Sequence, residues 1–160
     1  PSSSSFFSLV GTGGWATETP APIATDALVG SQGSKAVLVW DGQLGRIASF
    51  SDGVWTVKGV ESVHRASAAV ASCGDSQLLV AGGVVWPDDI QRDDSASFSG
   101  PAEQTALLID TSTGEVTTET DLPAGADATT LILMSRATTV GCDTYLISAS
   151  DGSVYRRSFD

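Results

Sequence analysis

Residues that could perform catalysis or hold a metal are few in this sequence. His64 is the only histidine, so neither a His-dependent catalytic triad nor a multi-histidine metal site can be assembled from this chain. Its place directly before Arg65 favours a structural or exposed role. The chain holds 19 Asp and Glu residues, but those at 17–19 and 117–120 are expected on solvated strand faces. We therefore expect no enzyme, with no catalytic residue, cofactor or bound metal.

The segment 86–101, WPDDIQRDDSASFSGP, is the best candidate for a binding site. It separates two strand-like runs where other parts of the chain have tight turns, and long connections are usually functional or disordered. Aromatic and arginine side chains suit a protein interface, whereas the alternating Asp pattern of a calcium loop is missing. The expected partner-binding residues are Trp86, Asp88, Asp89, Arg92, Asp93, Asp94 and Phe98, and a loop without a partner is the alternative.

The net charge of −11 limits the classes of partner. An acidic surface repels the phosphates of nucleic acids and the headgroups of anionic membranes, so neither is expected. No apolar run approaches the roughly 20 residues that span a bilayer, so membrane insertion is not expected either. The charge could select a basic protein partner or serve solubility alone. The compartment stays open, with an extracellular location favoured over a cytoplasmic one.

Short apolar runs, rather than helical periodicity, organise the chain. They are AVLVW at 36–40, VWTV at 54–57, LLVA at 78–81, ALLI at 106–109 and YLIS at 145–148. Turn signals lie between them: Asp-Gly at 41–42, 52–53 and 151–152, Gly-Gly at 82–83 and TSTGE at 111–115. Runs of this length between tight turns predict an all-β chain folded as an antiparallel meander.

The runs recur in a similar order, which indicates internal repeats. Segments 27–50, 69–86 and 139–156 each contain a small-residue strand, a turn, an apolar strand, a second turn and another strand. Outer-strand patterns stand at 53–60, at 114–123 and, alone, at 13–22. We expect a single domain over 1–160, with repeats at 24–60, 64–123 and 136–160 and with 5–22 as a latch strand.

These repeats resemble those of the kelch family of β-propellers, to which galactose oxidase also belongs. The matching positions are the arginines that open a repeat, the glycine pair that ends a strand and the outer-strand tryptophans: Arg65, Arg136, Gly82, Gly83, Trp15 and Trp55. The first and third repeats lack the glycine pair, and Val116 replaces the tryptophan of the second. The resemblance implies blades of four antiparallel strands, about three of them in this chain.

Two other propeller families offer alternative resemblances. Residues 140–155, VGCDTYLISASDGSVY, are similar to the repeat of the chromosome-condensation regulator family, although that family has His where this chain has Thr144. LLIDTSTGEV at 107–116 resembles quinoprotein-type repeats. All three resemblances imply a propeller and differ only in the family.

A four-stranded blade has two apolar faces and needs a neighbour on each side. Gly82 and Gly83 would supply positive φ angles and close backbone approach, while Arg65 and Arg136 would bridge adjacent blades through carboxylates or carbonyls. Propellers close with at least four blades, and this chain has about three. We therefore expect a partial propeller, or half of a dimeric six-bladed one in which latch strands are shared, rather than a functional monomer.

Cys73 and Cys142 form neither a disulfide framework nor a four-ligand zinc site. They fall at matching positions of two repeats. Such positions in neighbouring blades are normally too far apart for the Cα separation of roughly 4.4–6.8 Å that a disulfide needs. Buried free thiols are expected.

Three functions remain open. The first is a non-enzymatic interaction module or assembly subunit whose propeller loops bind a protein partner or a second copy. The second is a secreted propeller that binds carbohydrate or a small ligand. The third is part of an enzyme whose catalytic residues lie outside this chain. The copper site of galactose oxidase needs two His and two Tyr, and the run 51–55 lacks the spacer of the sialidase Asp-box, so neither activity is expected.

Overall fold

The computed structural model describes residues 6–10, 14–24, 27–30, 37–60, 63–73, 76–85, 103–122, 136–140, 144–148 and 154–158. Within these residues the chain is all-β, with fifteen strands in five sheets and no helix. The predicted fold class, all-β with antiparallel sheets, is confirmed. Among the described residues there is accordingly no helix long and apolar enough to cross a membrane.

The first sheet contains β3 (Ala27–Gly30), β4 (Val37–Asp41), β5 (Arg46–Ser51) and β6 (Val54–Gly59), in that order. Each strand pairs antiparallel with its neighbours in the sequence, which makes a meander. Asp52 and Gly53 connect β5 to β6 with φ angles of 51° and 80°. Two positive φ angles in a two-residue turn fit the right-handed twist of a hairpin. The Asp-Gly signal in the sequence therefore places this turn correctly.

The second sheet runs β8 (Ala69–Cys73), β9 (Gln77–Ala81), β11 (Thr105–Asp110) and β12 (Val116–Asp121). Two short strands, β7 (Arg65–Ala66) and β10 (Val84–Val85), pair with each other. Gly82 and Gly83 follow β9 with φ angles of 62° and 93°. A Cβ added at Gly83 would lie 2.9 Å from the carbonyl oxygen of Ala66. Both features agree with the backbone freedom expected of this glycine pair.

The third sheet has three strands, β13 (Arg136–Val140), β14 (Thr144–Ser148) and β15 (Val154–Ser158), in that order. Its register matches that of the first three strands of the second sheet. In the third sheet, Ser148 of the middle strand lies opposite Arg136 on one side and Val154 on the other. In the second sheet, Ala81 of β9 lies opposite Ala69 and Ala106 in the same way. The three larger sheets lie within the three repeats expected from the sequence.

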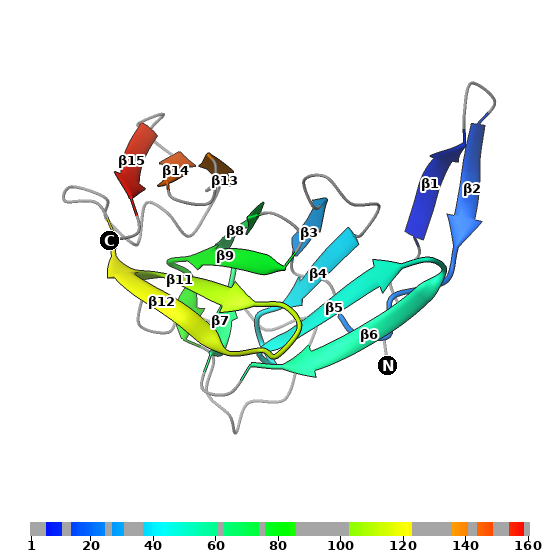
Figure 1. Ribbon diagram of the computed structural model, residues 1–160, viewed down its shortest axis with the longest axis horizontal. Helices are drawn as coiled ribbons and strands as arrows, with labels where there is room; N and C mark the ends of the chain where they lie inside the picture. Colours follow the sequence, from blue (N-terminus) through cyan, green and yellow to red (C-terminus); the bar gives the residue numbers. More distant parts are fainter. Residues whose placement is uncertain are drawn as a thin grey trace.

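A separate hairpin contains β1 (Phe6–Val10) and β2 (Gly14–Glu18). Among the described strands β2 pairs with β1 and not with β15, so the latch expected at 5–22 is not closed within this chain. Figure 1 shows why, since the hairpin and β15 stand at opposite ends of the molecule. Exchange of the latch between two chains stays a prediction.

The main hydrophobic core lies between the first and second sheets. Side chains of β4 and β5 pack with side chains of β9 and β11 and with two valines of the intervening connection: Leu38, Trp40, Ile47, Leu78, Val80, Leu107, Ile109, Val60 and Val63. The opposite faces of both sheets are buried as well, through Val39 and Ala48 in the first and Leu79 and Leu108 in the second. Two apolar faces, as expected from the sequence, are therefore present in both sheets.

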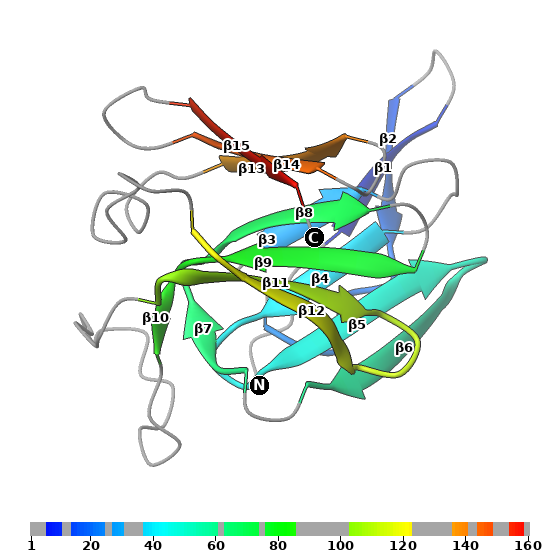
Figure 2. The same ribbon diagram turned by 60° about the vertical axis from the view of Figure 1, so that its left-hand side comes forward.

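The first strands of the three larger sheets lie next to one another. The Cα atoms of β8 approach those of β3 on one side and of β13 on the other to within 8 Å. From these strands each sheet leads away in its own direction, as the two views in Figures 1 and 2 show. The far face of the first sheet has a different cover, because Ala21 and Ile23 pack on Val39 and Ala48 there.

Candidate functional site

Two buried charged side chains mark the junction between the first and second sheets. Asp41 ends β4 and is 0% exposed, and Arg65 begins β7 and is 7% exposed. A buried charge is costly unless hydrogen bonds or an opposite charge compensate for the lost water. The partners of these two residues therefore define how the junction is built.

Arg65 connects the first sheet to the second. Its backbone carbonyl accepts a hydrogen bond of 3.3 Å from Nε1 of Trp40, in the first sheet. Its guanidinium donates through Nη1 to the carbonyl oxygen of Thr105 at 2.9 Å and through Nη2 to the Thr105 hydroxyl at 2.8 Å. The same Nη2 lies 3.4 Å from a carboxylate oxygen of Glu103. Arg65 thus links the two sheets, with its backbone carbonyl on the first and its guanidinium on the second, and a bridge to an adjacent blade through the side chain stays a prediction.

The electrostatic environment of Arg65 contains opposing effects. Burial lowers the pKa of its guanidinium from the ordinary value, while the carboxylates of Glu103 and Glu119 raise it. An arginine side chain remains protonated at physiological pH even when partly desolvated. Arg65 therefore acts as a permanent charged donor that fixes the start of β11.

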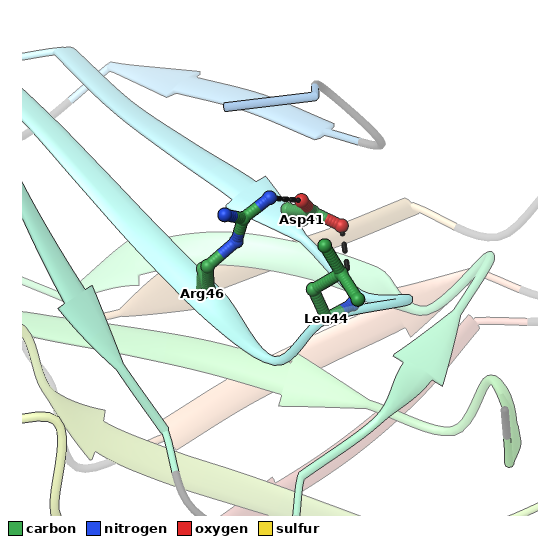
Figure 3. Close-up of polar contacts among 3 residues, drawn as sticks. All are labelled: Asp41, Leu44 and Arg46. Atoms are coloured by element: carbon green, nitrogen blue, oxygen red, sulfur yellow. Dashed lines mark hydrogen bonds and ion pairs between the residues drawn. The ribbon is translucent and has the colours of Figure 1, made fainter. Parts of the chain in front are cut away.

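A tight turn at residues 41–46 holds the first sheet's side of the junction (Figure 3). Oδ2 of Asp41 lies 2.7 Å from Nη2 of Arg46, and Oδ1 accepts a 3.2 Å hydrogen bond from the amide of Leu44. The Asp41 carboxylate thus accepts hydrogen bonds from a backbone amide inside the turn and from the guanidinium of Arg46 at its end. Two other buried side-chain atoms of the turn, Oε1 of Gln43 and Nε of Arg46, have no hydrogen-bond partner in the part of the chain that the structure describes.

Glycines let this turn contact the connection to the second sheet. A Cβ added at Gly42 would lie 2.0 Å from the carbonyl oxygen of Arg65. Gly45 has a φ of 55°, and its carbonyl oxygen accepts a 2.6 Å hydrogen bond from the amide of Val60. His64 lies against the same turn, with its Cδ2 3.1 Å from the Cβ position of Gly45. The single histidine is half-buried in this contact.

A second turn of the same Asp-x-x-x-Gly spacing contributes to the junction. Oδ1 of Asp110 accepts hydrogen bonds from the Ser112 hydroxyl at 2.6 Å, the Ser112 amide at 2.7 Å and the Thr113 amide at 3.1 Å. The bonds from Ser112 and then Thr113 lower the pKa of Asp110 from its ordinary value. Gly114, with a φ of 81°, brings the turn against the carbonyl oxygen of Gly59 at the end of β6.

The predicted binding segment starts and ends at this junction. Its residues Trp86, Asp88, Asp89, Arg92, Asp93, Asp94 and Phe98 lie outside the described residues. The residues on either side are described: Val85 pairs with Arg65, and Glu103 makes the ion pair with Arg65. The amide of Glu103 also donates to the carbonyl oxygen of Gly83 at 2.9 Å. Arg65 therefore contacts the described residues that flank the segment 86–101 on both sides.

The other residues singled out in the sequence are spread over the fold. Trp55 lies in β6, the outer strand of the first sheet, where its Nε1 donates to the carbonyl oxygen of Thr19 at 2.9 Å and its ring centroid is 4.9 Å from that of Phe50. Trp15 lies in β2 and Arg136 begins β13, but their side chains lie outside the described part. These positions do not converge on one site.

The expected equivalence of the two cysteines is wrong. Cys73 ends β8 and lies opposite Gln77, and the same register position in the third sheet belongs to Val140, which lies opposite Thr144. Cys142 falls outside the described residues. Within the described residues, no group of three or more His, Cys, Asp or Glu side chains could hold a metal ion.

The sequence did not single out Trp40, Asp41, Glu103 or Thr105 as a cluster. The available signal was the repeated Asp-x-x-x-Gly spacing at 41–45 and 110–114. Chemically, the contacts of Asp41, Arg65 and Asp110 given above are hydrogen bonds and ion pairs that fix backbone positions, which suits a scaffold. Comparison of the chain with protein-family models and with curated proteins finds no match.

Proposed function

We propose that this chain is part of a β-propeller and serves as a non-enzymatic protein-interaction module, presenting the segment 86–101 to a partner protein. The observation that carries this proposal is the position of Arg65, which anchors both ends of the segment through Val85 and Glu103. A long segment fixed at both ends by a buried guanidinium is presented from a rigid base, as binding loops on stable scaffolds are.

The arrangement of the sheets supports the propeller. A propeller consists of meander sheets that pack face to face, with their first strands around a common axis. Here the first two sheets share a core, and β8 lies between β3 and β13. The described residues form three larger sheets, and propellers close with at least four, so completion calls for further sheets from another chain or from a longer protein.

The composition of the segment supports a protein partner. Trp86, Phe98 and Arg92 are of the types enriched at the energetic centres of interfaces. The neighbouring aspartates belong to a chain of charge −11, which favours a basic surface on the partner.

The test uses the double variant Trp86→Ala/Phe98→Ala of the intact chain. We expect it to lose the proteins that co-purify with the wild-type chain, as quantified by mass spectrometry, while its urea unfolding midpoint is unchanged. The matched control is Leu44→Ala, which removes an exposed apolar side chain from the turn on the other side of the junction. Undiminished partner recovery with the double variant, or no co-purifying partner with the wild-type chain, would contradict the proposal.

A further inference from the structure

Two of the Asp-Gly pairs in the sequence lie in described turns, and their environments differ. Asp41 and Gly42 begin the buried turn of the junction, whereas Asp52 and Gly53 form the exposed turn between β5 and β6. The pair at 151–152 lies outside the described residues. A glycine has no side chain to shield its amide nitrogen from the preceding aspartate. The surroundings of each pair therefore decide whether the aspartate side chain reacts with the backbone.

The pair at the junction is protected by its contacts. The carboxylate of Asp41 is fully buried, lies 2.7 Å from Nη2 of Arg46 and accepts a hydrogen bond from the amide of Leu44 (Figure 3). Gly42 is packed so closely that an added Cβ would clash with the carbonyl oxygen of Arg65. Neither the carboxylate nor the backbone at Gly42 can therefore turn toward the other without opening the junction.

The pair between β5 and β6 is open to solvent. Asp52 and Gly53 are both exposed, and a Cβ added at Gly53 would meet no atom of the described residues within 4 Å. The carboxylate of Asp52 accepts a 3.3 Å hydrogen bond from the hydroxyl of Ser51, and both side chains are exposed. Figure 2 shows this turn projecting from the edge of the molecule. Such a turn opens locally at a small cost in free energy, because little packing is lost with it.

We propose that Asp52 is a site of spontaneous isomerisation to isoaspartate. The amide nitrogen of Gly53 attacks Cγ of the protonated Asp52 carboxyl group, and a C–N bond forms as one carboxyl oxygen leaves as water with the carboxyl proton and the amide proton. The cyclic imide then takes up one water. Addition at Cγ breaks the new bond and restores aspartate, whereas addition at the main-chain carbonyl carbon breaks the original peptide bond and leaves isoaspartate. Water is the only other reactant.

Isoaspartate at position 52 adds one methylene group to the backbone of a turn that joins two paired strands. A two-residue turn sets the register of its hairpin, so the longer backbone no longer holds Phe50 opposite Trp55. Trp55 packs on the buried cluster that includes Ala21, and its indole donates to the carbonyl oxygen of Thr19. The reaction therefore loosens β6 and, through Trp55, the cover on the far face of the first sheet. This inference is independent of the proposed function.

Incubation of the full chain in heavy-oxygen water, followed by peptide mapping with mass spectrometry, tests the inference, because imide hydrolysis introduces a solvent oxygen. In the folded chain we expect label to accumulate more than about tenfold faster at Asp52 than at Asp41, since an exposed turn opens without its sheet and a buried turn does not. In the urea-unfolded chain, which is the matched control, both pairs should react at similar rates. Asp52→Glu, which would need a larger and more slowly formed imide ring, should give no isomerised product at this position.

Amide hydrogen exchange links the product to the fold. In the fraction that carries isoaspartate at position 52, the amides of β6 should lose protection, while those of β9 in the second sheet keep theirs. Equal labelling of Asp41 and Asp52 in the folded chain, or no labelling of Asp52 over a time in which the unfolded chain reacts, would overturn the site. Isoaspartate at this position with unchanged protection of β6 would overturn its effect on the hairpin.

Discussion

The second and third sheets share the register of their first three strands, but only the second carries a fourth strand, β12. In the second sheet both faces are buried, and β12 pairs along β11. In the third sheet the equivalent strand β15 has exposed residues and no further strand beside it among the described residues. Among the described residues, the same register is thus followed by a fourth strand in the second sheet and not in the third.

The first sheet is covered by a different part of the chain. The indole of Trp55 donates to the carbonyl oxygen of Thr19, and Ala21 and Ile23 pack on the far face of that sheet.

The largest effect that contrasts the two sheets is expected from Leu78→Ala. Leu78 is fully buried between the first and second sheets, so its truncation removes apolar contacts and leaves a cavity. We expect a loss of about 2–5 kcal/mol in the free energy of unfolding, measured with urea. Val154→Ala on β15 should change the same quantity by less than about 0.5 kcal/mol in the monomer. Equal losses would show that the second sheet is not the more tightly packed of the two.

The next effect concerns the charged side of the junction. Arg65→Met keeps an apolar stem but leaves the carbonyl oxygen and the hydroxyl of Thr105 without their donor. We expect a loss of about 1.5–3 kcal/mol in urea unfolding, as for buried hydrogen bonds to charged groups. Lys58→Met on exposed β6 should cost less than about 0.5 kcal/mol. If the two variants lost the same stability, Arg65 would not fix the base of the segment 86–101.

A smaller effect is expected from steric contact at the turn of residues 41–46. Gly42→Ala places a Cβ 2.0 Å from the carbonyl oxygen of Arg65, so the turn must move away from the connection. We expect a loss of about 1–3 kcal/mol. Gly59→Ala has no atom within 4 Å of its new Cβ and is the matched control. The measurement is thermal unfolding of both variants. Equal stability of Gly42→Ala and Gly59→Ala would contradict the contact between Gly42 and Arg65.

The smallest effect is the pH dependence contributed by Asp110. Hydrogen bonds from Ser112 and Thr113 lower its pKa in the folded protein, so the unfolded chain binds its proton more readily. The resulting stability is present above the unfolded pKa of about 4 and is lost as the pH falls through the lower folded pKa. We expect the stability difference between wild type and Asp110→Asn to shrink below that pH. A constant difference between pH 7 and pH 2 would contradict the role of the turn.

The strands and many of the turns could be predicted from the sequence because they depend on local patterns. Apolar runs such as 78–81 became buried strands, and Asp52-Gly53 formed the expected hairpin turn. The two-faced burial followed from the lack of alternation in LLVA and ALLI. These features need only neighbouring residues to specify them.

The junction could not be predicted, because it depends on contacts between distant parts of the chain. Nothing local in Gly42 indicates that the carbonyl of Arg65 lies against it, and the pairing of Glu103 with Arg65 spans the whole of β8, β9 and β10. The wrong matching of Cys73 with Cys142 has a similar origin. The two cysteines stand near similar turn residues in the sequence, but strand pairing gives Cys73 the register position of Val140.

Amide hydrogen exchange, compared between the wild-type chain and Arg65→Met, tests most directly whether Arg65 fixes the base of the segment 86–101. If it does, the substitution should lower the protection of β10 and β11, while the protection of β5 stays constant. Equal protection of β10 and β11 in the two proteins would contradict the anchoring role of Arg65.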